Sequence, residues 1–319
     1  LRDGPDDSPW YLYARAEVHL HWALLRMKFE DYLPAAVDIN RAFRLLKKNE
    51  ERYPEFAPTY KSIGILRMAV GTIPDKYMWA VKFFSSLEGT IESGLRDLDY
   101  AVSRGEETNM LPLIEARYLY AQALLHFAND AEGSWQYIQE IAPDPRSSEL
   151  ACFLMANIAM RTGHNDAAID IIAMRPSSPT SFRINYVDMM LGRAKLYRGD
   201  YDAAQAFEKF LRDFDGINYR KEAYQKLAWQ SLIDGDEEGY RRYMDTCKTT
   251  GNDLLDEDKN ASKEALTGDM PDPQLLTARL RFDGGYLNDA LQAINAVDRN
   301  TLSEAHVLEY EYRKARIFH

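Results

Sequence analysis

The side chains best suited to metal binding or nucleophilic catalysis are few and scattered along the chain. His19 and His21, two of the six histidines, lie two positions apart on an expected helix. They point roughly 200° apart and so cannot hold one ion together. Cys152 and Cys247 lie in apolar helical stretches, where a Cys is usually a small buried side chain. The sequence has no His-Glu-x-x-His, Cys-x-x-Cys, Gly-x-Ser-x-Gly or phosphate-binding Gly-rich loop. We therefore predict no metal site and no cofactor.

Paired carboxylates are the other residues suited to catalysis, and they are abundant because the chain has 50 acidic residues. Asp234 and Asp236 lie at a Gly turn, where turn and helix-cap hydrogen bonding explains them. Asp253, Asp256 and Asp258 lack the register and the final Glu of a calcium loop. A glycoside hydrolase needs two acids that face each other at about 5–10 Å, and no segment indicates such a pair. The residue types thus predict a protein that is not an enzyme.

Composition and charge narrow the classes of partner. The chain has 319 residues, of which 46% are hydrophobic and 28% charged, so it has the material for a sizeable core. Its formal net charge is −11, and we find no local basic patch in the sequence. We therefore expect neither nucleic acid nor an anionic membrane surface as a partner. The longest apolar run, residues 150–160, is too short to span a bilayer.

Small residues recur along the chain at regular spacing, which is the pattern of an internal repeat. Four of their seven successive spacings are 35 to 37 residues, close to a helix–turn–helix repeat of about 34 residues. A generic helical bundle does not need small residues at a fixed period. The residues are Ala23, Gly64, Ala121, Ala156, Gly192, Ala228, Ala278 and Ala315.

The units around two of these residues have further features in common. One unit reads Leu191-Gly192, then a turn at Gly199-Asp200-Tyr201, then Ala204. The next unit has Tyr224, Leu227, Ala228 and Gly235 at matching positions. The pattern resembles the tetratricopeptide repeat family. The resemblance implies an all-α fold, an α-solenoid in a right-handed superhelix. It covers residues 1–319 as a single array of about seven hairpins plus a truncated last one, whose final helix begins at Glu304.

Two insertions interrupt the expected array, near residues 71–104 and 248–273. In the first, Pro74 begins an apolar helix, and a second helix is expected from Ile91 to Val102. The second carries a net charge of −4 and is predicted to be a solvated acidic loop or a short helix. At the start of the array, Ser8 followed by Pro9 predicts a helix N-terminus, because Ser caps the helix and Pro suits its first position.

In the tetratricopeptide family the first helix of each hairpin lines a concave groove. The positions carried over by this resemblance are rich in aromatic residues and Arg, the types that contribute most energy to protein interfaces. They contain no Lys, so the carboxylate-clamp function of some members is not carried over. The predicted groove residues are Phe153, Asn157, Arg161, Tyr186, Met189, Arg193, Tyr197, Gln225, Trp229, Arg279, Phe282, Tyr312 and Arg316.

The resemblance and the groove together predict a non-enzymatic scaffold or adaptor that binds a protein or peptide. The alternative is a carbohydrate- or nutrient-binding bacterial cell-surface protein built on the same helices, since the 20 Tyr would suit stacking on sugar rings. An enzyme with an active site inside a helical toroid is a third possibility. Because the chain begins with Leu1 and not Met, we expect a processed protein, exported to the periplasm or cell surface rather than cytoplasmic.

Overall fold

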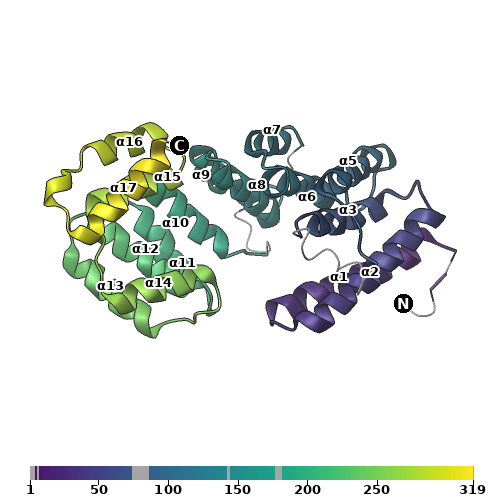
Figure 1. Ribbon diagram of the computed structural model, residues 1–319, viewed down its shortest axis with the longest axis horizontal. Helices are drawn as coiled ribbons and strands as arrows, with labels where there is room; N and C mark the ends of the chain where they lie inside the picture. The colour runs from purple at the N-terminus through teal and green to yellow at the C-terminus, as the bar shows by residue number, and fades with distance from the viewer. Residues whose placement is uncertain (1–3, 6, 74–85, 142–143, 177–181, 319) are drawn as a thin grey trace. The chain divides into compact units, whose positions relative to one another are not determined.

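The computed structural model describes residues 4–5, 7–73, 86–141, 144–176 and 182–318. Over these residues the chain forms sixteen α-helices and no strand (Figure 1). The all-α prediction is therefore confirmed for the described part of the chain. The helix predicted to begin at Pro74 lies outside the described residues. The chain divides into two compact units, residues 1–141 and 142–319, which are treated separately below.

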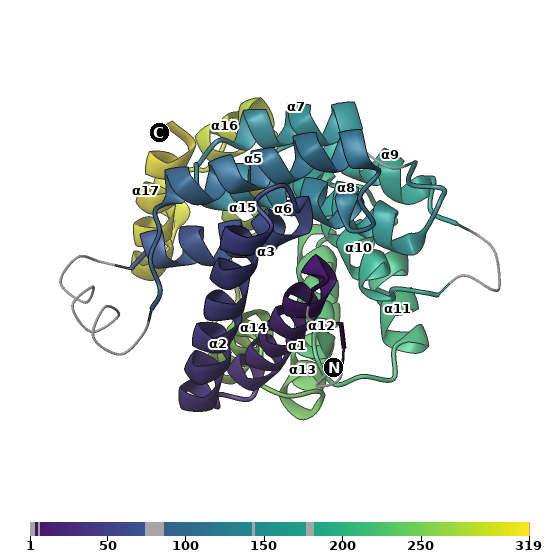
Figure 2. The ribbon, with the colours of Figure 1, turned by 90° about the vertical axis from the view of Figure 1, so that its right-hand side faces the viewer.

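The first unit is a run of antiparallel helix pairs. In both Figure 1 and Figure 2, α1 and α2 lie side by side. Ser8 caps α1 as predicted, since its side chain accepts a hydrogen bond from the backbone N–H of Trp10 at 3.3 Å. The helices are α1 (Pro9–Lys28), α2 (Tyr32–Arg52), α3 (Ala57–Gly71), α5 (Ile91–Thr108), α6 (Leu113–His126) and α7 (Ala131–Ile141).

Charged side chains connect helices of the first unit. Lys61 on α3 is 2% exposed. Its Nζ lies 3.0 Å from a carboxylate oxygen of Glu17 on α1 and 3.0 Å from one of Glu115 on α6. The core beside it is built from Tyr13, Phe43 and neighbouring aliphatic residues. The buried ammonium therefore joins the first helices of three successive hairpins.

The second unit continues the same pattern with shorter helices. Each of its antiparallel pairs also packs on a neighbouring helix. A single 3₁₀ turn, Arg299–Thr301, precedes the last helix. The helices are α8 (Glu149–Arg161), α9 (Asn165–Ala173), α10 (Tyr186–Arg198), α11 (Ala203–Asp213), α12 (Arg220–Ile233), α13 (Glu237–Thr249), α14 (Asp256–Thr267), α15 (Pro273–Asp283), α16 (Leu287–Asn295) and α17 (Glu304–Phe318).

The small residues that indicated the repeat lie where helix pairs approach closely. All of them are buried except Ala315. A Cβ on Gly192 of α10 would lie 2.6 Å from the ring of Phe207 on α11, and one on Gly64 would lie 2.8 Å from the carbonyl oxygen of Gly94. Ala315 is exposed on α17, which the described chain leaves without a following helix. The structure is thus compatible with helical repeats.

The turn between α15 and α16 returns to the turn between α8 and α9, far back along the chain. A Cβ on Gly285 would lie 2.5 Å from the carbonyl oxygen of Gly163. The Tyr286 hydroxyl donates to Asp166 Oδ1 at 2.8 Å and accepts from Asn165 Nδ2 at 3.0 Å. We call this contact the closing contact, because it joins hairpins that are not neighbours in sequence.

The acidic segment 248–273 holds α14, which packs on α12 and α13. Asp258 on α14 is 0% exposed. Its carboxylate accepts hydrogen bonds from the backbone N–H of Tyr219 at 2.6 Å and of Glu222 at 3.1 Å. Of the two forms predicted for this segment, a solvated acidic loop or a short helix, the structure shows the helix, and Asp258 on it caps the N-terminus of α12.

Candidate functional site

A hollow of about 660 Å³ lies in the second unit, lined by residues of α10, α12, α14 and α15. These four helices come together because α15 packs on both α10 and α12, and α14 on α12. Five predicted groove residues line the hollow: Arg193, Tyr197, Gln225, Trp229 and Arg279. Five of the positions that the family resemblance implied as groove residues thus share one cavity.

Other predicted groove residues gather outside this hollow. Phe153 and Tyr186 stack edge to face, with ring centroids 6.2 Å apart. Near the end of the unit, the guanidinium of Arg316 lies 5.1 Å from the ring centroid of Phe282 and also donates to the Tyr312 hydroxyl at 3.0 Å. Both groups are outside the lining of the hollow.

The three other predicted groove residues, Asn157, Arg161 and Met189, differ in how exposed they are. Asn157 is half-buried on α8, and Arg161 is exposed at the end of the same helix. Met189 is 0% exposed and belongs to the core formed with Phe207 and Phe210. Its assignment to the groove surface is wrong, because its side chain fills the space between helices and presents no surface to a partner.

Trp229 forms the floor of the hollow. It is 2% exposed, and its indole Nε1 donates to Glu264 Oε1 at 2.8 Å. The Nζ of Lys226 lies 3.6 Å and the guanidinium carbon of Arg279 4.8 Å from the ring centroid. The Trp229 ring therefore already makes cation–π interactions with Lys226 and Arg279.

An ion pair between α10 and α12 forms one wall. Arg193 pairs with the Glu222 carboxylate, and also donates to the Tyr186 hydroxyl at 3.0 Å. The side chains of Arg193 and Glu222 are 15% and 5% exposed. Burial raises the pKa of Tyr197, beside this pair, to about 12. Its hydroxyl therefore keeps its proton even in moderately alkaline solution.

Lys226 is a lining residue that the sequence analysis missed. Its Nζ donates to Gln225 Oε1 at 2.9 Å and lies 3.9 Å from Glu222 Oε1. Burial lowers its pKa to about 8, and attraction by Glu222 only partly opposes this effect. Lys226 and Trp229 are three positions apart on one helix, so they share a face. That spacing was the available signal.

The lowered pKa of Lys226 predicts a pH dependence of stability. The unfolded Lys has a pKa of about 10.4, so between pH 8 and that value the unfolded chain holds a proton that the folded chain has lost. Stability must then rise with pH in this range. We expect the free energy of unfolding of the native chain, relative to Lys226→Met, to increase by up to about 3 kcal/mol from pH 8 to pH 10.5. Urea titrations of both proteins at several pH values measure it, and a flat or falling difference contradicts it.

The lining carries both signs of charge. Lys226, Lys263, Arg193 and Arg279 face Glu222, Glu257, Glu264 and Asp269. Glu264 accepts hydrogen bonds from the side chains of Gln225 at 2.6 Å, Trp229 at 2.8 Å and Tyr240 at 3.1 Å. Lys263 has no hydrogen bond or ion pair to any described residue and is exposed. The hollow thus offers a fixed acid and an unpaired cation to a polar ligand.

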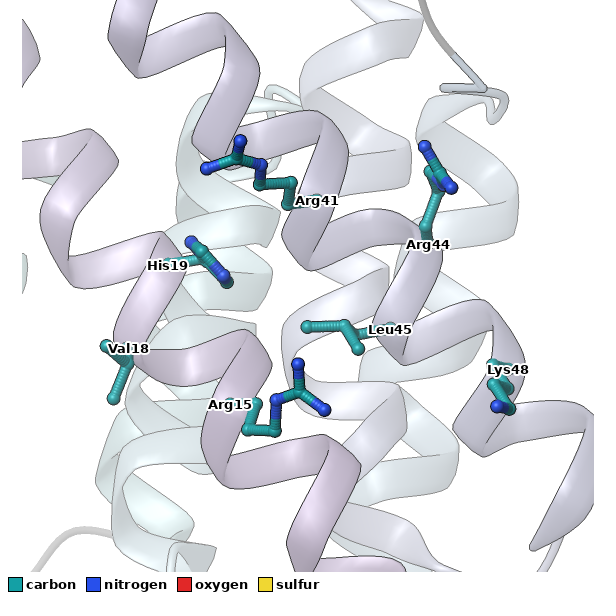
Figure 3. A pocket seen from close by; sticks show the side chains of 7 residues that line it. All are labelled: Arg15, Val18, His19, Arg41, Arg44, Leu45 and Lys48. Atoms are coloured by element: carbon teal, nitrogen blue, oxygen red, sulfur yellow. The ribbon is translucent and has the colours of Figure 1, made fainter. Parts of the chain in front are cut away.

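A second hollow, of about 810 Å³, lies between α1 and α2 in the first unit. Figure 3 shows Arg15 and His19 on α1 facing Leu45 and Arg41 on α2. We call it the basic groove; its lining residues are Arg15, Val18, His19, Arg41, Arg44, Leu45 and Lys48. The expectation that the chain has no basic patch is therefore wrong. The cations lie in two helices and come together only when the hairpin forms.

The two cysteines are free, and both are 0% exposed. Burial raises the pKa of each thiol to about 11, which leaves little reactive thiolate at neutral pH. Within the described ranges, no group of three or more His, Cys, Asp or Glu side chains is placed to share a metal ion. No helix of the described chain combines the length and the hydropathy needed to cross a bilayer.

No protein-family model matches the chain, and no curated protein matches it either.

Proposed function

We propose that the chain is a tetratricopeptide-type α-solenoid scaffold, which binds a peptide segment of a partner protein in the hollow of the second unit. The observation that carries the proposal is the composition of that hollow. Its rim offers exposed side chains of both charges and an amide, from Lys263, Glu257 and Asn260 on α14. A peptide supplies matching groups, because its backbone donates and accepts hydrogen bonds and its side chains carry either charge.

The carbohydrate-binding alternative is less favoured for a specific reason. Stacking on a sugar needs an aromatic face that is open to solvent. Trp229 is 2% exposed, and cationic groups of Lys226 and Arg279 already lie against its ring. The Tyr197 side chain is also largely covered. A peptide held by the charged rim requires neither ring to be open.

The experiment changes two cations of the lining and leaves Trp229 in place. Replacing Trp229 would remove a core side chain at a cost of about 3–5 kcal/mol, so lost binding would not be informative. We choose Lys263→Gln with Arg279→Gln, because Lys263 is exposed and the Arg279 side chain is about one third exposed. The matched control is Arg241→Gln with Lys248→Gln on α13, which removes two cations outside the hollow.

Peptides are selected on the immobilised native chain from a phage-displayed random library, and the best one is synthesised with a fluorescent label. We expect the hollow variant to weaken its binding about tenfold, at a few-fold for each lost charge contact, and the control to bind like the native chain. Equal binding by all three proteins would place the peptide elsewhere. If no peptide is selected while a glycan array gives specific ligands, the carbohydrate-binding alternative replaces the proposal.

A further inference from the structure

We propose that the basic groove between α1 and α2 is a docking site for an acidic, partly apolar segment of a partner protein. This surface belongs to the first unit and shares no residue with the hollow of the second. Its cationic lining contrasts with the chain's net charge of −11. The lining contains Arg15, Arg41, Arg44 and Lys48 and no carboxylate.

The cations of α2 are arranged as a row. Arg41, Arg44 and Lys48 lie at i, i+3 and i+7, which places them on one side of the helix over a length of about 10 Å. All three are exposed. Within the described chain, Arg44 and Lys48 have no ion pair or hydrogen bond through their side chains. A row of exposed cations, two of them without an ion pair in the described chain, fits carboxylates that are themselves spaced along a peptide.

The nearest buried acid does not neutralise this row. Asp38 is 3% exposed and accepts from His19 Nδ1 at 2.8 Å. It also forms an ion pair with Arg26. Arg41 reaches it only at 3.9 Å. The hydrogen bond to His19 and the ion pair with Arg26 thus already occupy the Asp38 carboxylate, and the exposed Arg41 guanidinium can still contact an external carboxylate.

Apolar side chains add a second requirement on the partner. Val18 and Leu45 are the apolar residues of the lining. Trp22 and Leu25 continue the face of α1 from Val18 at i+4 and i+7, and they are 53% and 45% exposed. Because exposed apolar area beside a charged groove is covered favourably by apolar side chains, the partner segment carries Leu- or Phe-type residues beside its acids.

The shape favours a peptide over the other anionic ligands. A single small phosphate calls for cations that converge on one point, whereas these are spread along two helices. A lipid surface is flat and touches protruding side chains, whereas Leu45 is recessed and half-buried between the helices (Figure 3). The net charge of −11 also repels an anionic bilayer as a whole. A protruding peptide side chain reaches the recess without bringing a large anionic surface near the chain.

The test is a fluorescence anisotropy titration with the full chain. The probe is a labelled peptide with Glu on one helical face and Leu on another, and its partner probe has Gln in place of every Glu. The test variant is Arg44→Glu with Lys48→Glu, chosen because neither cation has an ion pair in the described structure. The matched control is Arg96→Glu with Arg241→Glu, which makes the same change in net charge outside the groove. A second variant, Arg15→Gln with Arg41→Gln, removes two other cations of the groove and tests the same proposal if the first variant fails to fold.

We expect the Glu peptide to bind the native chain and the control, and the Gln peptide to bind neither. The groove variants should weaken binding of the Glu peptide at least about tenfold, since two attractive pairs are lost and, in the first variant, become repulsive. No binding of the Glu peptide, or equal loss in the control, overturns the proposal. Binding of phosphatidylserine vesicles without the peptide assigns the groove to membranes instead, and salt-sensitive self-association abolished by the variants assigns it to a second copy.

Discussion

Arg193→Met is expected to lower the free energy of unfolding of the second unit by about 3 kcal/mol. The substitution removes the cation that pairs with Glu222 and leaves that carboxylate, 5% exposed, without its main partner. Breaking a buried ion pair in this way costs about 3–5 kcal/mol. We expect the lower end, because Nζ of Lys226 remains 3.9 Å from Glu222. Urea denaturation followed by circular dichroism measures the change.

Two further proteins make this result specific to the buried pair. The double variant Arg193→Met with Glu222→Met removes both charges and should be more stable than Arg193→Met alone. Arg241→Met breaks an exposed pair with Glu237, whose side chains are 61% and 55% exposed, and should cost no more than about 0.5 kcal/mol. If Arg193→Met costs as little as Arg241→Met, the pair does not hold α10 on α12.

Gly285→Ala is expected to destabilise the second unit by about 3 kcal/mol or more, from backbone strain and steric overlap together. Gly285 has φ +81°, where a residue with a Cβ costs roughly 1–2 kcal/mol. The new Cβ would also lie 2.5 Å from the carbonyl oxygen of Gly163, a backbone atom that cannot move aside alone. The closing contact must therefore open for Ala to be accommodated.

Gly235→Ala is the matched control for this prediction. Gly235 has φ +84°, and no atom lies within 4 Å of the position that a Cβ would take, so it carries the same conformational cost without the overlap. The difference between the two variants, measured as free energies of unfolding, reports the closing contact alone. Equal losses of about 1 kcal/mol in both would show that the α15–α16 turn does not depend on close approach to Gly163.

The helices and their pairing could be predicted because they depend on local chemistry. Ser8 before Pro9 identified the start of α1, and the period of the small residues located contacts such as Gly192 against Phe207. The family resemblance implied that Trp229 and Arg279 lie on one surface, and both line the hollow. Helix starts and helix–helix contacts can be predicted from the sequence because a helix repeats every 3.6 residues and each hairpin must bury one face against its neighbour.

The rest of the site depends on contacts that no local pattern encodes. The basic groove combines Arg15 with Arg41 and Lys48, which meet only across a hairpin. Lys226 shares a helix face with Trp229, but that spacing does not show that its ammonium lies 3.6 Å from the Trp229 ring centroid. The acidic composition of segment 248–273 carries no sign that Asp258 caps the N-terminus of another helix.

The closing contact also changes how the second unit should fold. In an open repeat array each hairpin touches only its neighbours, so the ends fray first and folding spreads from one hairpin to the next. Here the hydrogen bond from Asn165 to Tyr286 spans 121 residues. Such a contact raises the contact order. Closing the long loop costs chain entropy, and the contacts that compensate for this cost form only late in folding. The second unit should therefore fold slowly for a helical protein, and its hairpins should lose amide-exchange protection together.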